Sequence, residues 1–350
     1  MRRGSTRGTG GLDEAVLLMQ RDASLPRYES LISADIDRNI SERVLGDEFV
    51  RGHVELAAHV DSGKAAEQTI VLPVFNQEGF IVRCIEGIAA NLSAPTDIAV
   101  ILDCCTDGSE EAVSSALARL GRRFERVTLV RTTYPLYETR CDNLGFLLSR
   151  GDYVIEMQSD IEVLTPGFDA LLKSPMIARP DIFSTSGRAG HWFGRLLPKE
   201  ERKRRFPVRN FIWSRLGFDR VGYSTNTSLQ NQAHEGRRRG GGAFALAETV
   251  VRGPLCIRRR DLLSLKLLDE QNFFLGFDEY DLHARGVAVG LGCAYVPLRL
   301  NIPLAIGSTR KPRSELNLLA YERYRQRTSD PYLTRFLESY RPRVRCRWVR

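Results

Sequence analysis

Short apolar runs alternate with helical patterns from Gln68 onward, and this alternation dominates the chain. Helical spacing recurs between the runs, at residues 80–92 and 139–148, with the apolar positions on one face. This alternation is typical of βαβ units in a parallel, doubly wound sheet flanked by helices, so we predict an α/β fold. The runs that predict strands are 70–74, 98–102, 127–131 and 153–157.

The pattern changes on both sides of this region. Residues 1–66 show a loose helical pattern, including an amphipathic stretch at 47–60, and predict a helical N-terminal extension. Residues 188–248 lose periodicity and are rich in Trp, Arg, Pro and Gly, which indicates a loop region beside a site. Pattern returns as a strand at 250–257, helices at 260–267 and 279–288, and a strand at 294–296. We therefore expect an extension (1–66), an α/β domain (67–300) and a basic helical tail (301–350).

Composition narrows the class of protein. With 350 residues, 43% hydrophobic and 27% charged, the chain can form a large core, which excludes a miniprotein, a collagen and a mostly disordered tail. No run approaches 18 apolar residues, and the basic N-terminus is not followed by an apolar signal core. The seven cysteines are scattered without CxxC spacing. We expect reduced thiols and a cytoplasmic protein.

The formal net charge of +8 suggests an anionic partner, which could be a nucleic acid, an acidic lipid or a phosphate-bearing substrate. The excess lies in arginine runs at 202–205, 237–239 and 341–350, where a solvated face is the ordinary explanation. No nucleic-acid module accompanies them, so nucleic-acid binding ranks last. The basic tail leaves peripheral contact with anionic lipid open, and the oligomeric state is not set by the sequence.

Polar residues follow the predicted strands. They lie in FNQEG (75–79), DCCTDGS (103–109) and QSDIE (158–162). Ligands of open α/β sheets bind outside the carboxyl ends of the strands, so these side chains should converge. Taken singly, Asn76, Asp103 and Asp107 could be turn or cap residues. Carboxylates gathered together repel one another unless a cation lies between them, which favours a bound metal.

Several segments together resemble family 2 glycosyltransferases. The first are TIVLPVFNQEG (69–79), LDCCTDGSEE (102–111) and DNLGFLLSRGDYVIEMQSDIEVLTPGF (142–168). RGPLCIRRRDLL (252–263), FFLGFDEYDLHARG (273–286) and CAYVP (293–297) resemble the acceptor-side block of that family. The likeness covers about residues 68–300, in the family's order and spacing.

The resemblance implies a GT-A fold that binds a UDP- or GDP-linked sugar and a hydroxyl acceptor, which could be a glycan, a lipid-linked sugar or a small molecule. It implies a metal-dependent transfer with Mn²⁺ or Mg²⁺, whose charge would neutralise the departing diphosphate. Asp160 matches the metal motif, and Asp103 matches a nucleotide-binding Asp. The other residues that the resemblance places against the substrates are Pro73, Phe75, Asn76, Glu78, Asn143, Gln158 and Asp281.

Two departures from the family pattern concern the donor site. Gln158 stands where the family's metal motif begins with Asp, and Cys104 and Cys105 replace Gly and Ser. An amide cannot supply charge, so the metal would depend more on Glu162 or on a histidine. The histidine candidates are His191 and His283, although a lone histidine is more often structural.

An acidic pair in the later block carries the expected chemistry. Asp278 and Glu279 align with the family's Glu–Asp pair in swapped order, and Glu279 takes the position of the general base of an inverting transfer. The sequence does not separate the two, and Asp281 is more simply a first-turn carboxylate of the following helix.

The sequence has no membrane helices and lacks the family's Gln-x-x-Arg-Trp block after the acidic pair. Both features argue against a processive polysaccharide synthase and for the addition of one sugar per event. We expect a role in polysaccharide biosynthesis. A non-catalytic nucleotide-sugar-binding or scaffold protein of the same fold is the alternative.

Overall fold

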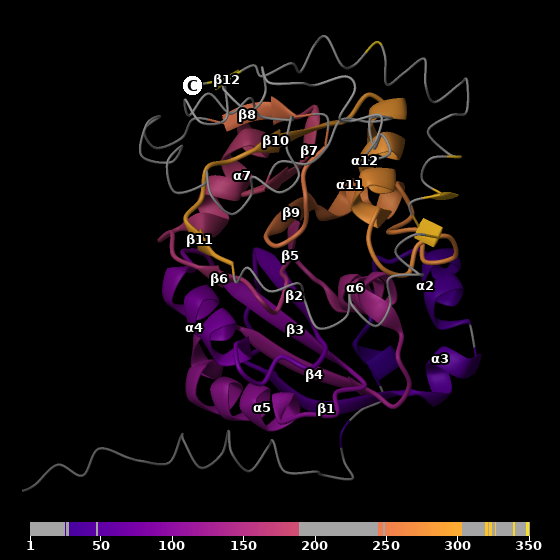
Figure 1. Ribbon diagram of the computed structural model, residues 1–350, viewed down its shortest axis with the longest axis vertical. Helices are drawn as coiled ribbons and strands as arrows, with labels where there is room; N and C mark the ends of the chain where they lie inside the picture. The colour runs from indigo at the N-terminus through magenta and orange to yellow at the C-terminus, as the bar shows by residue number, and fades with distance from the viewer. Residues whose placement is uncertain are drawn as a thin grey trace, which may run out of the picture.

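The computed structural model describes residues 28–46, 48–188, 244–247 and 249–302, with residue 25 and pieces of the C-terminal region at 319–320, 322–323, 326, 339 and 348–349. These residues build a ten-stranded mixed sheet (Figure 1). Its strands are β1 (Val54–Asp61), β2 (Gln68–Val74), β3 (Thr96–Asp103), β4 (Arg126–Thr132), β5 (Tyr153–Glu156), β7 (Ile182–Ser186), β8 (Phe244–Ala247), β9 (Leu255–Arg258), β10 (Gly292–Tyr295) and β12 (Trp348–Val349).

The strands lie in the order β1-β4-β3-β2-β5-β9-β7-β10-β8-β12. Neighbours from β4 through β5 pair in parallel, as do β7 and β10, whereas β9 is antiparallel to both β5 and β7. A separate small sheet pairs β6 (Glu162–Val163) with β11 (Leu300–Asn301). The predicted α/β class with a mostly parallel sheet is confirmed, and the four predicted strands β2 to β5 are found within two residues of their expected ends.

Helices cover both faces of the sheet (Figure 1). One apolar cluster joins the sheet to α4 (Ile81–Asn91), α5 (Ser109–Leu120) and α7 (Phe168–Ala178). The other joins it to α2 (Arg38–Leu45), α6 (Tyr137–Leu148), α11 (Arg259–Ser264) and α12 (Asp278–Ala288). The remaining helical elements are α3 (Glu48–Gly52) and the 3₁₀ turns at Tyr28–Leu31 and Gly121–Arg123. The sheet is therefore buried on both faces, as its continuous apolar strands require.

Helix α6 lies close against the sheet because Gly145 has no side chain. A Cβ there would stand 2.2 Å from Val71 Cγ1 of β2 and 3.1 Å from Ile101 Cδ1 of β3. This close approach places the start of α6 beside the carboxyl ends of the parallel strands.

The N-terminal region differs from the expected helical extension. Helices α2 and α3 lie in it, but residues 54–61 form β1, which pairs antiparallel with β4. The helix predicted over 47–60 is therefore wrong beyond residue 52. Only two of the eight residues of β1 are fully buried, so the spacing of its apolar residues is a weak guide to its structure. Pairing with β4 in the sheet decides the conformation instead.

Most of the expected loop at 188–248 and most of the tail at 301–350 lie outside the described residues. Within the described part, residues 244–247 form β8 and residues 348–349 form β12, which pair with each other. Among the residues that the structure describes, no helix has both the length and the apolar character needed to cross a bilayer.

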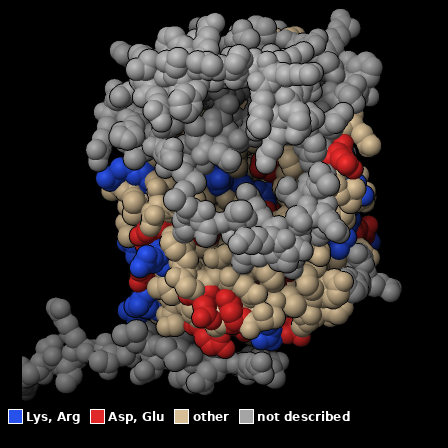
Figure 2. Space-filling model, in the orientation of Figure 1, with Lys and Arg blue, Asp and Glu red and all other residues tan. Residues whose placement is uncertain are grey.

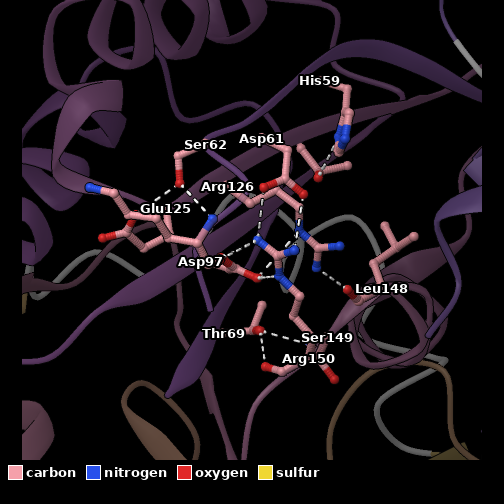
Figure 3. Close-up of polar contacts among 12 residues, drawn as sticks. His59, Asp61, Ser62, Thr69, Asp97, Glu125, Arg126, Leu148, Ser149 and Arg150 are labelled. Carbon is pink, nitrogen blue, oxygen red and sulfur yellow. Dashed lines mark hydrogen bonds and ion pairs between the residues drawn. The ribbon is translucent and has the colours of Figure 1, made fainter. Parts of the chain in front are cut away.

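A buried ion network ties β1, β3 and β4 together at the end of the sheet opposite the carboxyl ends of the parallel strands (Figure 3). Asp97 at the start of β3 accepts from Arg150 Nε at 2.6 Å and lies 3.3 Å from Arg126 Nε. Arg150 also pairs with Asp61 of β1, at 3.0 Å. Asp97 and Arg126 are buried, so removing the carboxylate leaves a buried guanidinium without its charge partner.

We expect Asp97→Asn to lower the free energy of unfolding by about 3 kcal/mol, because it breaks a buried ion pair. Asp61→Asn is the matched control: Asp61 is 31% exposed and should cost no more than about 1 kcal/mol. Urea unfolding of both variants measures the difference. Equal losses would mean that the burial of Asp97 contributes nothing beyond a surface pair.

Candidate functional site

The loops that follow β2 and β3 are hydrogen bonded to each other. Asn76 donates from Nδ2 to Thr106 Oγ1 at 3.1 Å and accepts from the Thr106 amide at 2.8 Å. Glu78 Oε2 accepts from the Gly108 amide at 2.5 Å, and Asp107 accepts from the Glu78 amide at 3.2 Å. The two loops are thus held together through Asn76 and Glu78, and their contact with a nucleotide stays a prediction.

Pro73 and Phe75 are partly exposed at the same edge of the sheet. Acidic side chains gather lower on the face seen in Figure 2, over α5, whose first turn carries Glu110 and Glu111. Asp107, which the sequence allowed as a cap residue, accepts from the Ser109 amide at 3.0 Å at the start of this helix.

Asp103 is buried at the end of β3 and binds the protein's own backbone. Its carboxylate accepts from the amides of Leu136 and Tyr137, at 2.7 and 3.1 Å, and from Thr132 Oγ1 at 3.2 Å. These bonds fix the loop that leads into α6. A role of Asp103 toward the nucleotide stays a prediction. Its described contacts are with Thr132 and the backbone before α6.

Two further predicted residues point into the protein. Asn143 is fully buried, and its amide bonds the backbone of Leu268 in both directions. Asp281 is also fully buried and accepts from Arg285 Nε at 2.8 Å, one turn further along α12. Their proposed contacts with substrate stay predictions, because the described contacts of both are internal.

The acidic pair lies at the start of α12, beside a buried arginine. Asp278 pairs with Arg252 Nη2 and accepts from Thr139 Oγ1 at 2.7 Å. Glu279 Oε2 lies 3.6 Å from the same Arg252 nitrogen. Arg252 is 2% exposed, so the acidic pair shares one charge that water screens poorly.

Arg252 collects more carboxylates than the acidic pair. Its Nη1 lies 3.0 Å from Glu138 and 3.1 Å from Asp142, both in α6, and its Nε lies 3.6 Å from Glu156 at the end of β5. The sequence analysis did not single out these three acids or assign a role to Arg252. The available signals were a glutamate ending an apolar strand and an arginine directly before Gly253 and Pro254.

Gln158 links this cluster to the loop after β5. Its Oε1 accepts from Arg188 Nη1 at 2.6 Å, and its Nε2 donates to Glu138 at 3.1 Å. Arg188 Nη1 also donates to the carbonyl of Arg252 at 2.8 Å. The residue that departs from the family's metal motif therefore binds an arginine, and connects the strand-end loop to the acidic pair.

Burial divides the protons among these acids. Burial, together with the negative charge of Asp278, raises the pKa of Glu279 well above its usual value. Burial also acts on Asp278, but the charge of Arg252 and the hydrogen bonds from Glu279 and Thr139 outweigh it and lower the pKa of that carboxyl. Burial raises the pKa of Asp142 as well. Five carboxyl groups thus surround Arg252 without all of them being charged.

Glu156 gives this cluster a measurable pH dependence. Burial raises the pKa of Glu156 to about 8, so between pH 4.5 and 8 the folded protein holds a proton that the unfolded chain releases. Stability should therefore fall as the pH rises through this range. We expect Glu156→Gln to reduce that slope. The free energy of unfolding of the variant, compared with that of the wild type, should be higher at pH 8 than at pH 5, as measured by urea unfolding at both pH values. A wild-type slope that persists in the variant would contradict this assignment.

The predicted metal residues are not grouped in the described part of the chain. Asp160 follows β5 and is partly exposed. The pKa of Cys84 in α4 is raised mainly by the burial of that thiol and, second, by the negative charge of Asp160. Glu162 accepts from Asn301 Nδ2 at 2.7 Å in the small sheet, and His283 is buried against Ser184 Oγ at 2.7 Å. His191 lies outside the described residues.

A single carboxylate is nevertheless compatible with a divalent ion. No three His, Cys, Asp or Glu side chains are grouped as metal ligands among the residues that the structure describes. Mg²⁺ beside a nucleotide commonly uses one or two carboxylates and completes its shell with phosphate oxygens and water. Asp160 fits that role, whereas Gln158 is engaged by Arg188.

The family model "Glycosyl transferase family 2" matches residues 69–228, so the resemblance of this part of the chain to family 2 glycosyltransferases is confirmed. The acceptor-side block at 252–297, with the acidic pair, lies outside the matched residues. A comparison with curated proteins finds no match.

One solved structure, GalNAc-T7, shares the fold. GalNAc-T7, solved with UDP, GalNAc and Mn²⁺, is 14% identical with a TM-score of 0.50; the match covers 80% of this chain and 55% of that protein. The mannosyltransferase PcManGT from Pyrobaculum calidifontis, solved with GDP-Man and Mn²⁺, is 13% identical with a TM-score of 0.49, covering 94% and 78%.

Proposed function

We propose that the protein transfers one sugar from a nucleoside-diphosphate sugar to a hydroxyl acceptor, with inversion and with a divalent metal. The observation that carries this proposal is the acidic pair of Asp278 and Glu279, buried at the start of α12 against Arg252. Arg252 is connected through Arg188 and Gln158 to the loop that holds Asp160. A base and a diphosphate site would thus share one edge of the sheet, as in-line displacement requires.

The roles of the residues follow from their charges. Glu279, in its ionised form, takes the proton of the acceptor hydroxyl as that hydroxyl attacks the anomeric carbon, and because its pKa is raised this form gains population as the pH rises. Asp278, held ionised by Arg252 and Thr139, fixes the guanidinium beside Glu279. Asp160 would hold Mn²⁺ or Mg²⁺, which would neutralise charge on the leaving diphosphate. The linked loops at Asn76 and Thr106 would receive the nucleotide.

The match to family 2 glycosyltransferases supports a sugar nucleotide as donor, and the GalNAc-T7 fold, solved with UDP and Mn²⁺, is consistent with it. The six described cysteines are free thiols, which supports the expectation of a cytoplasmic protein. A glycan is the acceptor we propose, as in polysaccharide biosynthesis.

Donor turnover tests the proposal. The protein is incubated with a panel of UDP- and GDP-sugars and Mn²⁺, with glycan acceptors or water, and release of the nucleoside diphosphate is followed. We expect turnover of at least one donor, with NMR showing the inverted anomer first. If the wild type binds a donor but releases no nucleotide with any acceptor class, a non-catalytic nucleotide-sugar-binding protein is the better description.

A further inference from the structure

Arg252 has no role assigned by the acidic pair alone, yet its geometry is specific. Its three guanidinium nitrogens face carboxylates from three elements: Nη2 faces Asp278 and Glu279 of α12, Nη1 faces α6, and Nε faces β5. Among the described residues, Arg252 and Asp278 are the charged groups that act on Glu279 directly, and Glu138, Asp142, Glu156 and Arg188 reach it through their contacts with Arg252.

The contacts of the two acids with this arginine are unequal. Asp278 makes a direct ion pair with Nη2 and takes a second hydrogen bond from Thr139. Glu279 lies 3.6 Å from the same nitrogen and takes no hydrogen bond from Thr139. Each acid keeps one buried oxygen without a hydrogen-bond partner, Asp278 Oδ1 and Glu279 Oε2, so the difference between them is the closer pairing of Asp278 with the guanidinium.

We propose that Arg252 is a positioning residue that divides the acidic pair into two roles: it fixes Asp278 as an anion and leaves Glu279 as the group that accepts the proton. The inference rests on the proposed function for its kinetic part. Asp278 would compete for the proton without Arg252, because two adjacent buried carboxylates do not both ionise readily. A planar fork with nitrogens facing three elements performs this task, and a single ammonium group does not reproduce it.

The first test compares Arg252→Gln with Arg252→Lys in donor hydrolysis across a pH series. Loss of the charge should move the acidic limb of kcat to higher pH by about one to three units, with the donor KM little changed. Lysine keeps the charge, so the acidic limb of kcat in Arg252→Lys should stay near the wild-type pH. The maximal kcat of that variant should fall about tenfold or more, because an ammonium group cannot face three elements at once.

Arg258→Lys and Arg258→Gln are the matched controls. Arg258 ends β9, is 8% exposed, and donates to the carbonyls of Met176, Pro180 and Ile182, away from the acidic pair. These variants should lower the melting temperature without moving the pH limb. If the Arg252 variants behave in the same way, Arg252 is only structural and the proposal is overturned.

A variant of opposite sign does not depend on the folding of the Arg252 variants. Glu138 is 23% exposed and faces Arg252 Nη1. Glu138→Gln removes one competitor for the guanidinium, so the limb should move to lower pH. A shift to higher pH, or none, would contradict the proposal.

Carboxyl titration separates this inference from the proposed function. Protein labelled with ¹³C at the glutamate carboxyls, with the Glu279 signal assigned by Glu279→Gln, reports the titration midpoint of Glu279 without any substrate. The midpoint should rise in Arg252→Gln and fall in Glu138→Gln. An unchanged midpoint refutes the role of Arg252, whereas a wild type that turns over no donor but shows both shifts refutes only the proposed function.

Discussion

Replacing Glu279 with Gln should lower sugar transfer by about 10²- to 10⁴-fold, the usual contribution of a positioned general base. The amide keeps the shape of the side chain but cannot take the acceptor proton. Glu279 is only 5% exposed, so solvent has little access to substitute for it. Steady-state release of nucleoside diphosphate, with donor affinity measured separately by calorimetry, gives the result: kcat falls and donor affinity stays within a few fold.

Asp278→Asn is the control that distinguishes the two acids. Asp278 is paired with Arg252 and accepts from Thr139, and these contacts help to lower its pKa, so it is the weaker base of the two. We expect this variant to lose stability, because it leaves Arg252 with one fewer charge partner. If Asp278→Asn abolishes turnover in a folded protein while Glu279→Gln retains it, the roles of the two acids are reversed.

The strands and the helix that carries the base could be predicted because local pattern dictates them. Buried parallel strands such as β3 are continuous apolar runs, and α12 begins directly at the acidic pair. Strand β1 could not be predicted in this way. It is an edge strand whose fully buried positions, Val54 and Ala58, are four residues apart, a spacing that also suits a helix.

The arginine at the centre of the site was harder to predict for a different reason. Its partners come from α6, β5 and α12, and the contacts with Glu138 and Asp142 of α6 join residues more than a hundred positions apart. The sequence close to Arg252 does not indicate these distant contacts. Asp103 illustrates the same limit, because a strand-end carboxylate suits a ligand and a backbone clasp equally well in the sequence, and only the tertiary fold shows the clasp to Leu136 and Tyr137.

Replacing Asp160 with Asn should have the second large effect, on the donor side of the reaction. Asn keeps an oxygen but loses the charge that holds a divalent ion, and metal stabilisation of a departing diphosphate is worth several kcal/mol. We therefore expect turnover to fall by at least about 10²-fold, the factor to which a few kcal/mol correspond. Calorimetry with UDP or GDP, with and without Mn²⁺, should show that the metal-dependent part of the affinity is lost as well.

Glu162→Gln is the matched control for this loss. Glu162 lies two residues further on, but its carboxylate accepts from Asn301 in the small sheet, so nucleotide binding and turnover should change little. If Glu162→Gln loses the Mn²⁺-dependent affinity and Asp160→Asn retains it, Glu162 is the ligand. If the wild type binds nucleotide equally with Mn²⁺ and with a chelator, the metal has no part in binding. Arg188, which binds Gln158 in the same loop as Asp160, would then be the first residue to test for the diphosphate.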